Sequence, residues 1–220
     1  MTLSAIKLET ASNPTVSIIW MHGLGADGND FVPIVKELDL SGCPGIRFVF
    51  PNAPQIPVTV NGGYVMPAWY DIRSADLANR EDETGLRSSQ AAIEELIGIE
   101  TAAGAQKIIL AGFSQGSAMT LQTGLRHSDK LAGLMCLSGY LPLHQTVAQE
   151  ASPANKNVPI FMAHGNADPV VPIQRALQSR DLLKQMGYQI EWHEYEMQHS
   201  VCIEEIVDIG CWLRKVLRQD

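Results

Sequence analysis

One segment, Lys107 to Gly116, constrains the fold more than any other part of the chain. It begins with the apolar run K-I-I-L-A, which is typical of a buried strand, and ends with the pentapeptide G-F-S-Q-G. Glycines at both ends of the pentapeptide let a strand turn sharply into a helix. Glycine has no Cβ, so the strand and the helix can approach closely at these two positions. Such a turn would hold Ser114 in a strained conformation with its hydroxyl exposed. The pattern predicts a nucleophilic serine, although a pentapeptide this short also occurs by chance.

Strand-like and helix-like patterns alternate along the chain. Short apolar runs bounded by turn residues suit buried strands of a largely parallel sheet, at Val16–Trp20, Ile46–Phe50, Lys107–Ala111, Leu131–Leu137, Ile160–His164 and Gln189–Tyr195. Apolar residues spaced three and four apart predict helices between these runs, over Thr84–Ala103, over Pro172–Met186 and from Cys202 onwards. The order predicts one α/β domain over residues 1–220, with a mostly parallel sheet between two layers of helices.

Composition excludes several classes of partner. The formal charge is −8, from 24 acidic and 16 basic residues, and no segment gathers the basic side chains that nucleic acid would require. No apolar run approaches the roughly 20 residues of a membrane span, and the first residues lack a secretory signal pattern. We therefore expect a cytoplasmic protein without stable membrane insertion. In that compartment we expect reduced thiols at all four cysteines: Cys43, Cys136, Cys202 and Cys211.

The longest region without a regular pattern runs from Pro51 to Arg80. Irregular segments of this length inside a compact domain are usually functional. The region holds Met66, Trp69 and Ile72 among other apolar residues, which makes it the expected wall of a binding cleft. An alternative is that these side chains fill the core beneath the loop, and for Trp69 the two interpretations are equally favoured.

A serine nucleophile needs a base and an orienting acid. Functional groups of open α/β sheets gather beyond the carboxyl ends of the strands, so both partners are expected just after late strands. Asp168 follows one such run, and Pro169 holds it in an extended loop because residues before proline avoid the helical region. His199 follows the last run. The order Ser114, Asp168, His199 is the one expected for an α/β hydrolase, with His199 as the base and Asp168 fixing its tautomer.

Other acidic and imidazole side chains are weaker alternatives. Four acids fall beside or within helices or along a strand, where solvated surface charge is the ordinary explanation: Asp129, Asp181, Glu191 and Glu194. His164 competes with His199 but is expected to be a hydrogen-bonded structural group at the end of its strand. The remaining histidines after Ser114 lack a comparable constellation and are expected at the surface: His127, His144 and His193.

The tetrahedral intermediate of acyl transfer needs two N–H donors aimed at its oxygen. Gln115, directly after the nucleophile, would give one. The other is expected from the loop after the first long strand, H-G-L-G, where the amide of Leu24 is our candidate. A metal site built from His22, His164, Asp168 and His199 is a weaker alternative because no local pair such as H-E-x-x-H supports it. We therefore predict no metal and no cofactor.

Taken together, four blocks resemble the carboxylesterase and acyl-protein thioesterase family of α/β hydrolases: W-M-H-G-L-G at 20–25, G-F-S-Q-G at 112–116, H-G-N-A-D-P-V-V-P at 164–172 and M-Q-H-S at 197–200. The segment P-A-W-Y-D-I at 67–72 is similar to the family's substrate-side loop. The resemblance implies an α/β hydrolase without a large cap, a Ser114–Asp168–His199 triad, and oxyanion donors at Leu24 and Gln115. Met66, Trp69, Ile72 and Val170 are the substrate-binding residues predicted with it. Ser117 and Gln198 depart from the family's usual glycines, which affects the expected cleft shape and substrate preference more than the chemistry.

The sequence leaves three functions open. The first is a serine carboxylesterase that forms an acyl-Ser114 intermediate on small or medium-chain esters, and the absence of the early cysteine of lipid-modified relatives favours it. The second is a thioesterase or lysophospholipase acting on long-chain acyl substrates. The third is a non-catalytic binding module on the same scaffold, which an intact triad disfavours. Acyl chain length, ester against thioester preference, and a homodimer are left open.

Overall fold

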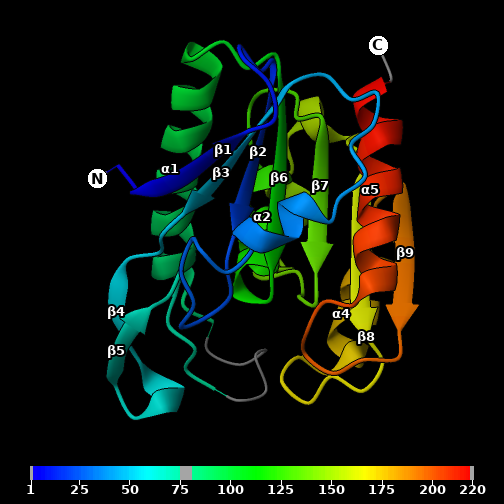
Figure 1. The fold of residues 1–220 in the computed structure, drawn as a ribbon. Helices are drawn as coiled ribbons and strands as arrows, with labels where there is room; N and C mark the ends of the chain where they lie inside the picture. The colour runs from blue at the N-terminus through cyan, green and yellow to red at the C-terminus, as the bar shows by residue number, and fades with distance from the viewer. Residues whose placement is uncertain (1, 75–80, 219–220) are drawn as a thin grey trace.

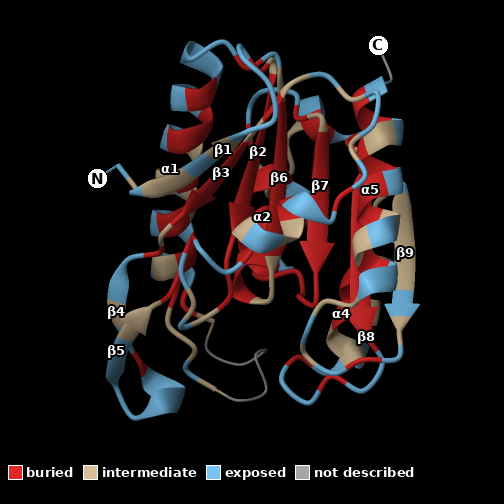
Figure 2. Ribbon diagram, in the orientation of Figure 1, coloured by how far each residue is buried: buried red, intermediate tan, exposed pale blue. Residues whose placement is uncertain are grey.

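The apolar runs of the sequence form the centre of a seven-stranded sheet in the computed structural model, which describes residues 2–74 and 81–218. Its strands lie in the order β1-β3-β2-β6-β7-β8-β9 and pair in parallel except for β1 at one edge. Their bounds are β1 Ala5–Glu9, β2 Val16–Met21, β3 Ile46–Pro51, β6 Lys107–Phe113, β7 Gly133–Leu137, β8 Ile160–Gly165 and β9 Ile190–Tyr195. Strands β2, β7 and β8 are buried along their whole length because helices cover both faces of the sheet, as Figure 2 shows.

Helices cover the two faces of the sheet unequally. One face packs against α1 (Glu83–Ala102), α2 (Gln115–Gly124), α3 (Val147–Glu150) and α4 (Ile173–Gln185), and the other against the 3-10 helix η1 (Val32–Lys36) and α5 (Ile203–Arg218). In Figure 1, α5 lies along β8 and β9. Its apolar face places Ile209, Trp212 and Leu213 in the core, while Glu204 and Lys215 face solvent. The predicted three-layer α/β architecture is confirmed.

Two pieces of strand were missed by the sequence patterns. Strand β1 is a half-exposed edge strand, so its apolar pattern is too weak to stand out. The region from Pro51 to Arg80, predicted to be irregular, contains an antiparallel hairpin of β4 (Gln55–Val58) and β5 (Tyr64–Pro67). Its turn includes the 3-10 helix η2 (Thr59–Asn61), with Gly62 and Gly63 at positive φ. Residues 75–80 of that region lie outside the described residues.

The parallel strands all end at one edge of the sheet, the lower edge in Figure 1. The loop after β2 carries H-G-L-G, the turn after β6 carries Ser114, and the loops after β8 and β9 carry Asp168 and His199. The β4–β5 hairpin lies at the same end of the molecule (Figure 1). The topology therefore brings all four signature blocks to one edge.

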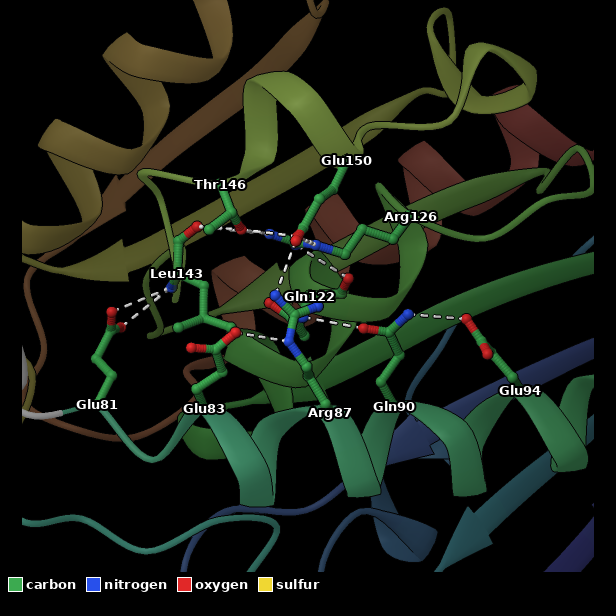
Figure 3. Close-up of polar contacts among 10 residues, drawn as sticks. All are labelled: Glu81, Glu83, Arg87, Gln90, Glu94, Gln122, Arg126, Leu143, Thr146 and Glu150. Carbon is green, nitrogen blue, oxygen red and sulfur yellow. Dashed lines mark hydrogen bonds and ion pairs between the residues drawn. The ribbon is translucent and has the colours of Figure 1, made fainter.

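Charged and amide side chains tie α1 to α2 and α3 (Figure 3). Arg87 on α1 and Arg126 just after α2 both donate hydrogen bonds to the carboxylate of Glu150, at 2.8 Å and 2.6 Å. Burial raises the pKa of Glu150, but these two guanidinium groups outweigh it and lower that pKa to about 2. Gln122 on α2 donates to the side-chain oxygen of Gln90 on α1 at 2.9 Å. These contacts fix the carboxyl-terminal end of α2 against α1 and α3.

Candidate active site

Ser114 occupies a strained turn between β6 and α2. Its φ of 55° and ψ of −115° lie outside the ordinary regions for a residue with a side chain. A Cβ on Gly112 would collide with the backbone of Gly116, and a Cβ on Gly116 would collide with the carbonyl oxygen of Met21. Both glycines are therefore needed for the close approach of strand, turn and helix. The turn directs the Ser114 hydroxyl toward the loop after β9.

His199 lies between Ser114 and Asp168 and is hydrogen-bonded to both. The distance from His199 Nε2 to Ser114 Oγ is 2.9 Å, and the distance from His199 Nδ1 to Asp168 Oδ2 is 2.6 Å. The Asp168 side chain is fully buried, whereas the imidazole of His199 keeps 16% of its surface exposed. The three residues that the sequence singled out are brought together from three separate loops.

The contacts of Asp168 decide which nitrogen of His199 carries the proton. Oδ1 of Asp168 accepts hydrogen bonds from the backbone N–H groups of Val170 and Val171, at 2.8 Å and 2.9 Å. An ionised carboxylate can only accept, so the N–H on Nδ1 of His199 donates to Oδ2. The lone pair of Nε2 is then free to accept the Ser114 hydroxyl proton. This arrangement can act as a general base on a serine.

His164, the rival base, lies near the same carboxylate oxygen of Asp168 but farther from it than His199. Its Nε2 lies 3.5 Å from Asp168 Oδ2 and donates a hydrogen bond to the carbonyl oxygen of Val171 at 2.8 Å. Burial lowers the pKa of His164, which favours a neutral ring that holds the Asp168 loop. Among the histidines predicted at the surface, His144 is exposed and His193 is half-buried, but His127 is buried, so the prediction was wrong for His127. The carbonyl oxygen of His127 accepts from the Asn155 amide, which holds that loop inside the protein.

The H-G-L-G loop after β2 lies directly beside the nucleophile. A Cβ on Gly23 would sit 3.4 Å from the Cβ of Ser114, in van der Waals contact, so the backbone of this loop lies against the nucleophile. Of the two predicted donors, Leu24 follows Gly23 in this loop, and Gln115 is the first residue of α2, directly after Ser114. Backbone N–H groups in the first helical turn have no partner within the helix, which leaves them available to a ligand.

His22, at the start of this loop, has a role that the sequence did not predict. Its Nε2 accepts a hydrogen bond from the backbone N–H of Ala53 at 3.0 Å, and its Nδ1 lies 2.7 Å from the carbonyl oxygen of Gly23. A backbone N–H can only donate and a carbonyl can only accept, so the ring is neutral with its proton on Nδ1. Burial lowers the pKa of His22 and favours the same neutral state. Its place directly before the glycine of the loop does not by itself distinguish this role.

The four predicted substrate-binding residues differ in position. Val170 is 56% exposed beside Asp168, and Met66 on β5 is half-buried, with its sulfur 3.7 Å from where a Cβ on Gly25 would be. Ile72 is half-buried and packs against the core. Trp69 is only 1% exposed and lies within the core. Its burial favours the alternative left open for this residue, that it supports the loop from inside.

The described ranges 2–74 and 81–218 hold no group of three or more His, Cys, Asp or Glu side chains placed to bind a metal ion. The same ranges hold no helix long and apolar enough to cross a bilayer. All four cysteines are free thiols, and burial raises the pKa of the Cys136 thiol well above its ordinary value.

Comparison with known proteins gives consistent matches. A model of the phospholipase/carboxylesterase family matches residues 5–217. The chain is 43% identical over 214 residues to acyl-protein thioesterase 1 of Neurospora crassa, covering 92% of this chain and 87% of that protein. It is 36% identical over 222 residues to acyl-protein thioesterase 1 of Yarrowia lipolytica, covering 98% of each. The crystal structure of Zea mays acyl-protein thioesterase 2 has a TM-score of 0.85 at 28% identity, covering 97% of this chain and 99% of that one.

Proposed function

The chain belongs to the phospholipase/carboxylesterase family, and on that premise we propose that it is a serine carboxylesterase acting through an acyl-Ser114 intermediate. Membership makes it a hydrolase of ester or thioester bonds. The observation that carries the finer proposal is the continuous hydrogen-bonded path from Ser114 Oγ through His199 to Asp168. This path supports nucleophilic attack by Ser114 on an acyl carbonyl.

In the proposed reaction, Ser114 Oγ attacks the carbonyl carbon while its proton passes to Nε2 of His199. The imidazolium that forms is stabilised by the buried carboxylate of Asp168. The negative charge on the former carbonyl oxygen is stabilised by the N–H groups of Leu24 and Gln115. Collapse breaks the ester C–O bond, and the proton on Nε2 leaves with the alcohol. Water then attacks the acyl-serine by the same route and releases the carboxylic acid.

The acyl chain is proposed to lie between β5 and the loop after β8. Met66 is apolar, half-buried and lies against Gly25, next to the proposed donor Leu24. Val170 is apolar and exposed, and its backbone N–H donates to Asp168. Ile72 supports the same wall from its half-buried position. Burial of a few apolar side chains against the chain would stabilise binding by about 0.8 kcal/mol for each buried CH₂ group.

A thioesterase acting on acylated proteins, or a lysophospholipase, is the second candidate. It uses the same Ser114 chemistry, with a thiol or a lysolipid alcohol as the leaving group. What favours it is that the relatives from Neurospora crassa and Yarrowia lipolytica are named acyl-protein thioesterases. Under either candidate, the four free thiols suit a reducing compartment, so we propose a cytoplasmic location. A homodimer stays a prediction.

Hydrolysis of p-nitrophenyl esters from acetyl to palmitoyl tests the proposal. Wild type should show a burst of p-nitrophenol, and Ser114→Ala should lower kcat by a factor on the order of 10⁶. Ser117→Ala is the matched control, since it makes the same change in the same turn, at a fully buried residue outside the hydrogen-bonded path. Ester turnover by Ser114→Ala at the wild-type rate would rule out the acyl-Ser114 intermediate.

Acyl esters and S-acyl peptides of equal chain length then separate the two candidates. A carboxylesterase should have its highest kcat/KM on short or medium-chain esters. A thioesterase of acylated proteins should instead favour S-palmitoyl peptides over esters of the same chain.

A further inference from the structure

Trp69 is hydrogen-bonded to both segments that carry the proposed oxyanion donors. Its indole N–H donates to the carbonyl oxygen of His22 at 2.9 Å, and this residue is two positions before Leu24. Its backbone N–H donates to the side-chain oxygen of Gln115 at 2.7 Å. One buried residue therefore links the loop after β2 to the first residue of α2.

The Gln115 side chain makes a second bond to the same loop. Its amide N–H donates to the carbonyl oxygen of Tyr70 at 2.7 Å, so it pairs with the backbone of two consecutive residues. On the other side, the hydroxyl of Ser89 on α1 donates to the carbonyl oxygen of Trp69. All four residues are buried, so these bonds form where water does not compete.

We propose that Trp69 and the side-chain amide of Gln115 are positioning residues that set the separation of the two oxyanion donors. We call this pair the Trp69 bracket. The proposal rests on the function proposed above, because the donors act in that reaction. The backbone N–H of Gln115 belongs to the residue whose side chain holds Trp69, and Leu24 is two residues from the carbonyl that Trp69 holds. A shift of Trp69 therefore moves one donor relative to the other.

Misplacement of an oxyanion donor affects the transition state more than the bound substrate. Charge develops on the oxygen only as the tetrahedral intermediate forms, and preorganised donors act on that charge. A displacement of about 1 Å can cost roughly 10²-fold in rate. Disturbing the bracket should therefore lower kcat while leaving KM for a short ester nearly unchanged.

Two variants remove the bracket's hydrogen bonds and keep its bulk. Trp69→Phe removes the indole N–H and keeps an aromatic ring. Gln115→Met removes both side-chain hydrogen bonds while keeping the side-chain length and the backbone donor. Each should lower kcat for p-nitrophenyl butyrate by roughly 10- to 100-fold with KM within about twofold. Each should also slow phosphonylation of Ser114 by a fluorophosphonate by a similar factor, since this step passes through a comparable charged intermediate.

Matched controls are available in the same core. Trp20 is as buried as Trp69, but its indole N–H has no hydrogen-bond partner within residues 2–74 and 81–218. Gln122, also on α2, bonds Gln90 away from the nucleophile. Trp20→Phe and Gln122→Met therefore make the same chemical changes outside the bracket. Both should keep kcat and labelling rate within about threefold of wild type, because neither substitution removes a hydrogen bond of the Trp69 bracket.

Three outcomes would overturn the bracket. The first is a labelling rate for both bracket variants equal to that of their controls. The second is a rise in KM at constant kcat, which would make Trp69 a substrate contact. The third is a failure of fluorophosphonate to label wild type at Ser114, and this result would overturn the proposed function as well. Labelling of wild type at Ser114 together with unslowed bracket variants would overturn the bracket alone.

Discussion

Two histidines at the carboxyl edge of the sheet have both ring nitrogens bonded, yet their partners differ in kind. His22, after β2, is held by the backbone of Ala53 and Gly23, and the ring is almost completely buried. His199, after β9, is held by the side chains of Asp168 and Ser114, and part of its ring is exposed. One ring has fixed neutral partners, and the other lies between a carboxylate and a hydroxyl.

The difference explains why only one of them can work as a base. A proton on Nε2 of His22 would face the N–H of Ala53, donor against donor, in a buried place. A proton on Nε2 of His199 is compensated by the carboxylate behind it and is released to a leaving group in front of it. Position at a strand end is shared by both histidines. The kind of partner decides whether a histidine is structural or catalytic.

Replacing His199 or His22 by Phe should separate activity from stability: the His199 variant should lose mainly activity, and the His22 variant mainly stability. His199→Phe should lower kcat for p-nitrophenyl esters by a factor on the order of 10⁶, because no other described group accepts the Ser114 proton. The phenyl ring can keep the contact with Phe113, whose ring centroid lies 4.7 Å from that of His199. The free energy of unfolding should fall by about 1–3 kcal/mol, because Oδ2 of the fully buried Asp168 loses its hydrogen-bond donor. Steady-state kinetics and urea unfolding check the two results, and retained turnover would contradict the assignment of the base.

Asp168→Asn should give the next largest effect. The one side-chain oxygen left in this variant would accept from the N–H groups of Val170 and Val171, which turns the new NH₂ group toward Nδ1 of His199. Nδ1 must then accept, so the proton moves to Nε2 and the ring can no longer receive one from Ser114. We expect kcat to fall by roughly 10⁴ with little change in KM. Kinetics at neutral pH test this, and activity within tenfold of wild type would show that Asp168 does not set the tautomer.

The reacting groups could be predicted from the sequence because each has a local signal. Ser114 lies in a pentapeptide with glycines at both ends, and Asp168 and His199 follow apolar runs in the expected order. The supporting groups have no such signal. Trp69 and Gln115 are 46 residues apart, and their hydrogen bond depends on how a loop folds back onto α2. No periodicity in the chain encodes that contact, so the roles of His22, Trp69 and the Gln115 side chain came only from the structure.

Among the strands, too, some could be predicted from the sequence and others could not. Strands β2, β6 and β8 are buried on both faces, so their apolar runs identify them within one or two residues. Strand β1 and the β4–β5 hairpin are partly exposed, and exposed strands carry mixed residues that resemble a loop. The Asn61-Gly62-Gly63 turn was the available signal for the hairpin.

His22→Phe should have a smaller effect on activity than the His199 variant and a larger one on stability. It leaves the N–H of Ala53 and the carbonyl of Gly23 without their buried partner, which costs about 1–3 kcal/mol for each group. The loop that carries Leu24 would shift, so kcat should fall by roughly 10- to 100-fold. Urea unfolding and ester kinetics measure both, with His199→Phe as the matched control. An unfolding free energy equal to that of wild type would contradict the structural role of His22.

The stability difference between wild type and His22→Phe should also depend on pH. Burial lowers the pKa of His22 in the folded protein, against the opposing effects of the Gly23 carbonyl, Asp30 and Asp27. Below about pH 6.5 the unfolded chain takes up a proton at this residue that the folded protein does not. The free energy of unfolding of wild type should therefore fall as the pH drops, by up to about 1.4 kcal/mol per pH unit from this residue. The variant lacks this contribution. His164, whose pKa is also lowered by burial, is present in both proteins, so its effect cancels in the comparison. The difference in unfolding free energy between wild type and His22→Phe should therefore narrow between about pH 7 and pH 5. Parallel curves of unfolding free energy against pH would show that His22 is not held neutral by the fold.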